Sequence, residues 1–211
     1  MILVGGLSSY APDSKLAEKN GHMMGCSYYR DYAKILREKG IPAYESTQAP
    51  YRSNWDQACG GISDSLAHVL DLLDVENADS YVRVGTLPSP ISAANLKELL
   101  HQQLGANVRC YPATDKPISR IAVAGGAYGE GYKAALAADA DAYVVGEIAH
   151  HEILDACARG LTVCDAGHFA TEWPGVKALH QRFLADAAAG CWSIQSHLHD
   201  KAPYAGAHLA L

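Results

Sequence analysis

The feature that most constrains the fold of this chain is a regular alternation of strand-like and helix-like segments in its C-terminal half. From Pro117 onward, apolar runs typical of buried strands alternate with helical patterns at intervals of about 20 residues. Strands are expected at 118–126, 142–147 and 161–167, and helices at 130–139, 150–160 and from near Glu172 to Ala189. Such alternation indicates βαβ units and a parallel sheet.

The remainder of the chain is compatible with the same fold class. Strands are expected at 1–4, 41–46 and 107–113, and helices at 27–40, 62–73 and 93–105. The segment 81–92 contains two prolines and a glycine, which predicts a connector. We therefore expect an α/β protein with mostly parallel sheets and helices on both faces.

Composition and charge exclude several classes of protein. The 211 residues are 49% hydrophobic and 19% charged, as in an ordinary globular protein with a sizeable core. The formal charge of −6 and the lack of a basic stripe argue against nucleic acid as a partner. No apolar run approaches the length of a membrane span, and the start MILVGG lacks the basic segment of a signal peptide. The six cysteines form no CxxC pair, which indicates reduced thiols and a cytoplasmic location.

Three loops follow the three regular strands, and they carry most of the polar chemistry. Their sequences are GGAYGEG (125–131), GEIAHHE (146–152) and DAGHFATE (165–172). Because the carboxyl ends of parallel strands lie at one edge of a sheet, these loops are expected to meet there, where ligands bind in such folds. The first loop is glycine-rich, which suits either a phosphate cradle or a tight turn, and it lacks the spacing of a P-loop.

His168 and Glu172 are separated by four residues, which places both side chains on one face if a helix begins near them. An imidazole and a carboxylate in this arrangement can share one divalent ion. The alternative is a loop histidine followed by an acid that favours the positive end of a helix. In the second loop, Glu147 and His151 allow the same two interpretations, a site or a solvated helix start.

Longer stretches of the sequence resemble the Nif-three-like family, the dinuclear-metal proteins also described as GTP cyclohydrolase type-two homologues. The resemblance is carried by SNWDQACGGISDSLAHVL, VGTLPSPIS, RIAVAGGAYGEGY and ADAYVVGEIAHHEILDACARGLTVCDAGHFATE, in family order. GHFATE is the most specific of these segments. Together they span about Ser53 to Leu184.

The resemblance implies a two-lobed α/β domain over 1–211, with lobes at about 1–84 and 116–211 joined by 85–115. It also implies a toroidal homohexamer with divalent metal ions, zinc, manganese or iron, in a cleft between the lobes. The residues present are enough for one open metal site and few for two ions, so the number is one or two per chain.

Carried over by position, the family's metal ligands correspond to Asp56, His168 and Glu172, with Glu172 as the bridging carboxylate. Glu147 and His151 correspond to polar residues that line the same cleft, as acid–base groups or as partners of the ligands. Taken by itself, Asp56 lies in a loop where aspartate usually forms a turn.

Two departures from the family pattern fall on this chemistry. Gly5-Gly6 follows the first strand where the family carries a His-His pair, and Arg52 precedes SNWD where it carries a histidine. Family chains also normally begin with extra helix and strand units before the first strand, which are absent here. The resemblance therefore leaves three possibilities: a chain truncated relative to the family, one altered at its site, or one descended from a member that lost part of it. Two hypotheses follow: a metal-dependent hydrolase of a nucleotide-like small molecule, and a non-catalytic ring-forming protein with a degenerate metal site.

Overall fold

The computed structural model describes residues 55–191 together with 193, 196 and 198. The chain divides into two compact units, Met1–Trp55 and Asp56–Leu211, and the fold described here is that of the second unit. The elements expected before residue 50 lie outside the described residues.

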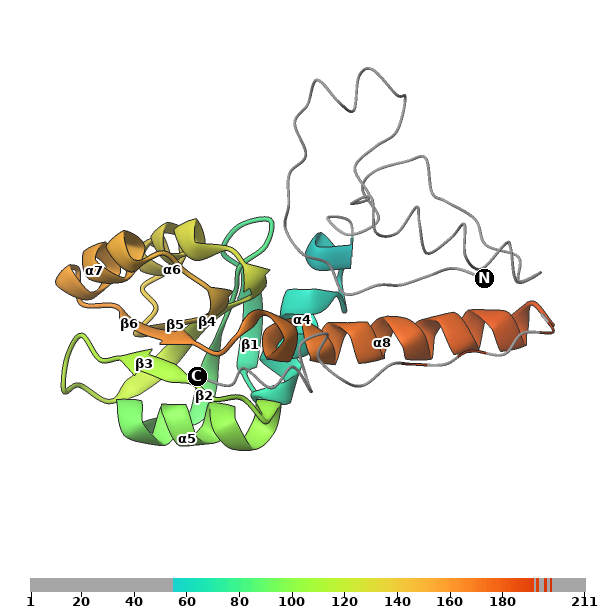
Figure 1. Ribbon diagram of the computed structural model, residues 1–211, viewed down its shortest axis with the longest axis horizontal. Coiled ribbons are helices and arrows are strands. Elements are labelled where there is room, and N and C mark those ends of the chain that lie inside the picture. The colour runs from blue at the N-terminus through green and yellow to red at the C-terminus, as the bar shows by residue number, and fades with distance from the viewer. Residues whose placement is uncertain (1–54, 192, 194–195, 197, 199–211) are drawn as a thin grey trace, which may run out of the picture. The chain divides into compact units, whose positions relative to one another are not determined.

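Strands and helices alternate through this unit (Figure 1). In chain order the elements are α4 (Ile62–Val69), β1 (Leu73–Asn77), β2 (Arg83–Ile91), α5 (Ala93–Leu104), β3 (Arg109–Tyr111), β4 (Ile118–Ala127), a 3-10 turn (Gly129–Gly131), α6 (Tyr132–Ala137), β5 (Ala142–Glu147), α7 (His150–Ala158), β6 (Thr162–Asp165) and α8 (His168–Ala189). The alternation expected from residue 118 onward is confirmed.

The six strands of the described residues form one sheet in the order β1-β2-β4-β5-β6-β3. The pairs β4–β5 and β5–β6 are parallel, whereas β1–β2, β2–β4 and β3–β6 are antiparallel. The α/β class is confirmed, but the sheet is mixed rather than mostly parallel. The parallel part is confined to the three strands whose periodicity was the clearest in the sequence.

The segment 81–92, expected as a connector, contains strand β2. Its first residues pair with β4 from Arg83 to Thr86, and pairing resumes only at Ile91. Pro88 and Pro90 lie within this register shift. Proline has no backbone N–H group, and here its absence removes no regular hydrogen bond between β2 and β4. The wider segment 85–115 is likewise part of the sheet unit, since it also holds α5 and β3.

Strand β1 was not expected, because the helix predicted over 62–73 ended at its first residue and 74–77 were assigned to no element. The helix ends at Val69, and Asp71 adopts a left-handed backbone conformation with φ of 52°. Aspartate tolerates this conformation better than most residues, and it reverses the chain into β1. The division into two lobes stays a prediction, because most of the first expected lobe lies outside the described residues.

Helices cover both faces of the sheet and enclose two apolar cores. Leu66 of α4 and Leu96 of α5 pack on one face, together with Val144 of β5. Tyr132 of α6 and Ile153 of α7 pack on the other face. Figure 1 shows α5 on one side of the strands and α6 with α7 on the other. The expectation of helices on both faces is therefore confirmed.

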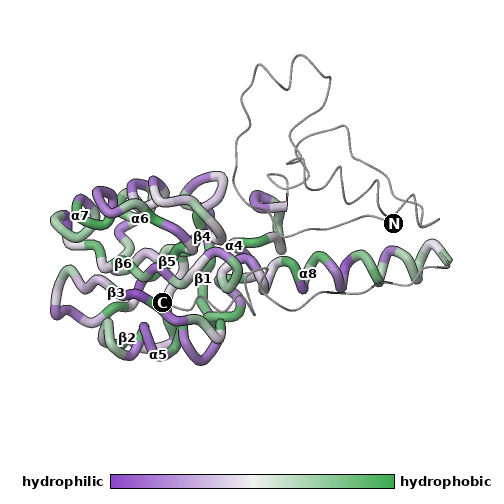
Figure 2. Tube along the Cα trace, in the orientation of Figure 1, coloured by the Kyte–Doolittle hydropathy of each residue, from purple (hydrophilic) through white to green (hydrophobic). Residues whose placement is uncertain are grey.

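Helix α8 begins against the sheet and packs along α4. Gly125 of β4 and Gly175 of α8 both lie so close to Ile62 that neither has room for a Cβ atom. Hydrophobic and hydrophilic stretches alternate along α8 (Figure 2), and four of its five buried residues lie between Thr171 and Gly175. Among the described residues, no helix is long and apolar enough to cross a membrane.

Candidate metal centre

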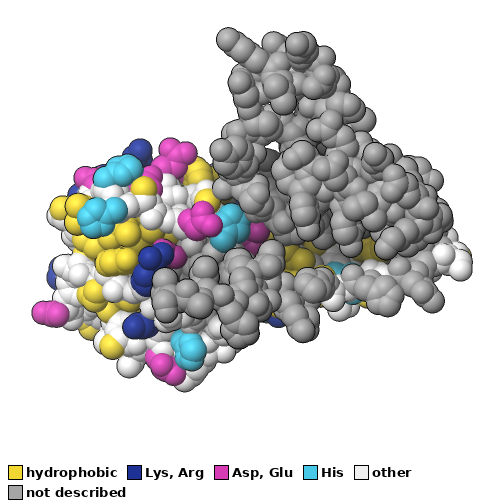
Figure 3. Space-filling model, viewed as in Figure 1, with side chains coloured by type: hydrophobic (Ala, Val, Ile, Leu, Met, Phe, Trp, Pro, Cys, Tyr) yellow, Lys and Arg dark blue, Asp and Glu magenta, His cyan; other side chains and the backbone are white. Residues whose placement is uncertain are grey.

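The candidate site lies where the parallel strands β4, β5 and β6 end. Ala127 of β4 pairs with Glu147, the last residue of β5. Three residues after the end of β6, helix α8 begins at His168, four residues earlier than the sequence suggested. This earlier start places both His168 and Glu172 in the first turns of one helix, as their spacing required. Acidic and histidine side chains lie together near the start of α8 (Figure 3).

His168 contacts a carboxylate through each of its ring nitrogens. Its Nδ1 lies 2.8 Å from Glu147 Oε1, and its Nε2 lies 3.1 Å from Glu172 Oε1. The side chains of His168 and Glu172 are 17% and 12% exposed, whereas that of Glu147 is 56% exposed. The imidazole thus bridges an inner carboxylate and one at the surface.

The two carboxylates raise the pKa of His168. The hydrogen bond to Glu172 is the largest cause, and the contact with Glu147 acts in the same direction. Burial of the ring opposes both, because it disfavours the charged imidazolium. The inner end of the site therefore favours a positive charge between His168 Nε2 and Glu172 Oε1, whether from a proton or from a cation.

A threonine fixes the first turn of α8 on the sheet. Thr171 Oγ1 accepts the backbone N–H of Gly126 at 3.0 Å and lies 3.0 Å from the carbonyl oxygens of Gly167 and His168. The Thr171 side chain is fully buried. The helix that carries the imidazole is therefore attached directly to the end of β4.

Two glycines at the strand ends make room for the site. A Cβ on Gly146 would lie 2.7 Å from the carbonyl oxygen of Gly126 and 2.9 Å from the Cα of His168. Gly126 has a φ of 70°, and its Cβ would lie 2.6 Å from Glu172 Oε1 and 3.2 Å from His168 Nε2. The space beside the two donor atoms exists because residue 126 has no side chain.

Gly126→Ala is expected to weaken metal binding while lowering stability only modestly. The left-handed backbone costs an alanine about 1–2 kcal/mol, and the added methyl group occupies the space beside Glu172 Oε1. Gly105→Ala is the matched control, because Gly105 has a φ of 64° and open space around its Cβ position. Chemical denaturation and metal titration of both variants measure the two effects. Equal metal affinity in both variants would contradict this placement of the site.

The structure brings together three of the five predicted site residues. Asp56 lies in a short helical turn before α4 and is partly buried. His151 lies in the first turn of α7 with its side chain exposed, and that side chain makes no hydrogen bond or ion pair within the described part. In the described portion of the chain, no group of three or more His, Cys, Asp or Glu side chains is arranged to hold a metal ion. Gly5-Gly6 and Arg52 lie outside the described residues.

Sequence reasoning did not identify Gly126 and Thr171 as parts of the site. Both lie within segments that were singled out, but nothing in a single sequence distinguishes a glycine beside a ligand from one in a turn. Glu152, which belonged to the crowded second loop, has a structural role instead. Its carboxylate accepts the backbone N–H of Ala149 and so stabilises the start of α7.

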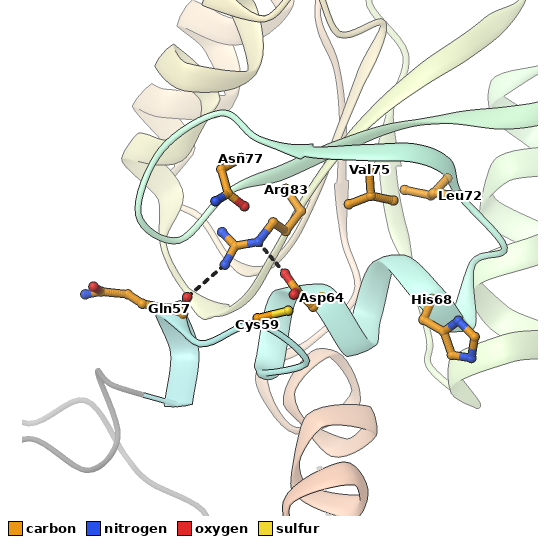
Figure 4. A pocket seen from close by; sticks show the side chains of 8 residues that line it. All are labelled: Gln57, Cys59, Asp64, His68, Leu72, Val75, Asn77 and Arg83. Atoms are coloured by element: carbon orange, nitrogen blue, oxygen red, sulfur yellow. Dashed lines mark hydrogen bonds and ion pairs between the residues drawn. The ribbon is translucent and has the colours of Figure 1, made fainter.

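A separate pocket of about 400 Å³ lies beside α4 and β1 (Figure 4). It is lined by Gln57, Cys59, Asp64, His68, Leu72, Val75, Asn77 and Arg83. The buried Arg83 guanidinium pairs with Asp64 and donates to the carbonyl oxygen of Gln57 at 3.1 Å. Because Asp64 neutralises its charge, Arg83 offers no uncompensated cation to an anionic ligand.

The fold and the site together define an α/β protein with a histidine–carboxylate cluster at the carboxyl edge of a mixed sheet. The chain belongs to the Duf34/NIF3 (NGG1p interacting factor 3) family, whose model matches residues 50–202. The expected resemblance is thereby confirmed.

Individual relatives agree with this assignment. The chain is 32% identical over 162 residues to a "GTP cyclohydrolase 1 type 2 homolog" of Nostoc, covering 72% of this chain and 59% of the relative. The solved structure of ybgI, a protein of unknown function, superposes with a TM-score of 0.68 at 23% identity, covering 80% of this chain and 67% of that one. Reduced HcgD from Methanocaldococcus jannaschii gives 0.60 at 27% identity, covering 82% and 73%. The chain spans 59% and 50% of two of the curated relatives it matches.

Proposed function

We propose that this chain binds a divalent metal ion through His168 and Glu172 and uses it to hydrolyse a nucleotide-like small molecule. The proposal rests on the convergence of His168 Nε2 and Glu172 Oε1, which lie 3.1 Å apart. Two ligands each about 2.1 Å from one ion lie about 3.0–3.4 Å apart at angles between 90° and tetrahedral. The observed separation fits two ligands of a single ion.

Glu147 is assigned the role of orienting the histidine. With its carboxylate 2.8 Å from Nδ1, it is proposed to accept a hydrogen bond from that nitrogen and so to direct Nε2, beside Glu172, toward the ion. Glu172 supplies a carboxylate oxygen, and Asp56 is proposed as a further ligand on the strength of the family pattern. A divalent ion held by these groups would supply Lewis acidity to a bound substrate.

Support for hydrolysis comes from the exposed side of the site. Glu147 is in contact with both His168 and solvent, so it can exchange protons with a substrate or with water. His151 remains a second candidate for proton transfer, on the first turn of the neighbouring helix. The nucleotide-like substrate is inferred from the relatives named as GTP cyclohydrolase 1 type 2 homologs. A homohexamer and a cytoplasmic location are parts of the same proposal.

One observation favours the alternative, a non-catalytic binding protein with a degenerate metal site. Within the residues that the structure describes, no third donor joins the pair in an arrangement suited to a metal ion. Catalytic metal sites usually combine three protein ligands with an open position. If Asp56 or another residue does not complete the set, binding is expected to be weak and turnover absent.

Metal-dependent stability separates a functional site from a degenerate one. At a free concentration 100 times the Kd, Mn²⁺, Zn²⁺ or Fe²⁺ is expected to stabilise the folded protein by about 2.7 kcal/mol. Calorimetric melting with each ion, compared with melting in buffer free of divalent metal, measures the effect. No shift with any ion would overturn the proposed metal site. A clear shift without hydrolysis of nucleoside triphosphates or related heterocycles would favour the non-catalytic role.

A further inference from the structure

Two cysteines outside the proposed metal site lie in direct contact. Cys110 of β3 and Cys164 of β6 are opposite one another in the antiparallel pairing, and their sulfur atoms are 3.0 Å apart. Residues directly opposite in antiparallel strands have Cα atoms about 4.5–5.5 Å apart. Disulfides join Cα atoms separated by about 4.4–6.8 Å. A bond between these sulfurs therefore requires no rearrangement of the strands.

The two thiols differ in exposure and in pKa, as expected for a pair in which one sulfur is the nucleophile. Cys164 is fully buried in the core beneath α5, whereas Cys110 is only partly buried on the edge strand β3. The Cys164 thiol donates a hydrogen bond to Cys110, and this bond is the main reason that the pKa of Cys110 is lowered. Lys97 acts in the same direction, and burial opposes it. Cys110 is thus the accessible nucleophile, and Cys164 is the protonated neighbour.

We propose that Cys110 and Cys164 form a redox-active dithiol that a peroxide converts into a cross-strand disulfide. The Cys110 thiolate attacks one peroxide oxygen, the O–O bond breaks, and hydroxide leaves and takes up a proton as water. The resulting Cys110 sulfenic acid is attacked by the Cys164 sulfur. The S–S bond forms, the S–O bond breaks, and a second water leaves with the Cys164 proton. Two thiols are oxidised by two electrons and one peroxide is reduced to two waters.

Another described thiol, Cys157, lies on the other face of the sheet. It belongs to α7, packs among the residues of the second core and lies 3.5 Å from the carbonyl oxygen of Tyr111. Cys59 and Cys191 are exposed, so they are accessible to peroxide. A link between residues 110 and 164 in preference to these more accessible thiols would therefore reflect the geometry of the pair.

Peptide mapping of the full chain tests the proposal. The reduced protein is treated with a small excess of hydrogen peroxide, alkylated with iodoacetamide and digested with trypsin without reductant. Each of the six cysteines lies on a different tryptic peptide, with Cys110 on 110–120, Cys157 on 134–159 and Cys164 on 160–177. We expect a linked pair of peptides 110–120 and 160–177 that has lost two hydrogen atoms and separates after dithiothreitol treatment.

Variants identify the contribution of each thiol. Cys157→Ala is the matched control and is expected to give the same linked pair, whereas Cys110→Ala and Cys164→Ala are each expected to abolish it. Circular dichroism checks that every variant is folded. The proposal is overturned if Cys110 and Cys164 stay alkylatable after peroxide, or if Cys110 proceeds to sulfinic acid while Cys164 remains a thiol. Links that involve mainly Cys59 or Cys191 would overturn it equally.

Discussion

Replacing His168 with alanine is expected to abolish divalent-metal binding without unfolding the protein. The imidazole supplies one of the two converging donor atoms, and Glu172 alone does not hold a divalent ion firmly. The fold should tolerate the change because alanine is the best helix former and His168 lies at the first position of α8. Glu147→Gln, which keeps both proposed ligands and weakens the orientation of the ring, is expected to lower metal affinity by about 10–100-fold.

Isothermal titration with Mn²⁺ or Zn²⁺ measures both variants, and circular dichroism checks their folding. His68→Ala is the matched control, because His68 is an exposed histidine on α4 outside the cluster. It should bind metal as the unmodified chain does. If His168→Ala unfolds the protein and the unmodified chain never binds metal, His168 is a structural residue and the proposed site is wrong.

Asp64→Ala is expected to lower the free energy of unfolding by about 3 kcal/mol, the largest stability effect of these substitutions. Asp64 pairs with the Arg83 guanidinium, whose side chain is only 3% exposed. Removing the carboxylate leaves a buried positive charge without its counter-ion, and it also removes the acceptor for the backbone N–H of Gly60. The 24% exposure of Asp64 admits some water and keeps the loss near the lower end of the usual range.

Glu76→Ala is the matched control for this prediction. Glu76 also pairs with an arginine, Arg120, but its side chain is 62% exposed and that of the arginine is 31% exposed. Exposed pairs usually contribute less than about 1 kcal/mol, so little stability should be lost. Urea denaturation of both variants gives the comparison. Similar losses in the two variants would show that burial of Arg83 is not what makes its ion pair important.

The parts of the fold that were predictable from sequence are those set by local periodicity. Strands β4, β5 and β6 are short apolar runs followed by helical patterns, and their parallel order places three loops at one edge. The pairing of His168 with Glu172 also follows from local geometry, because residues four apart lie on one face of a helix. The contact of Glu147 with His168 then follows from neighbouring strands that end together.

The parts that were not predictable depend on contacts between distant residues. Prolines 88 and 90 predicted a connector, and only the register shift against β4 explains how β2 accommodates them. The antiparallel edge strands depend on pairing partners that no local pattern specifies. The same holds for the close approach of Gly146 to α8 and for the pairing of Cys110 with Cys164. Whether Asp56 completes the ligand set also depends on tertiary structure, and it stays a prediction.

Metal content per chain tests the central claim most directly. The full chain is purified without a chelating column, supplied with Mn²⁺, Zn²⁺ or Fe²⁺ under reducing conditions, desalted and analysed by elemental mass spectrometry. We expect at least one divalent ion per chain in the unmodified protein and none retained by His168→Ala. No retained ion in the unmodified protein, after reconstitution with each metal, would contradict the proposed site and leave the histidine–carboxylate cluster as a structural feature of the helix start.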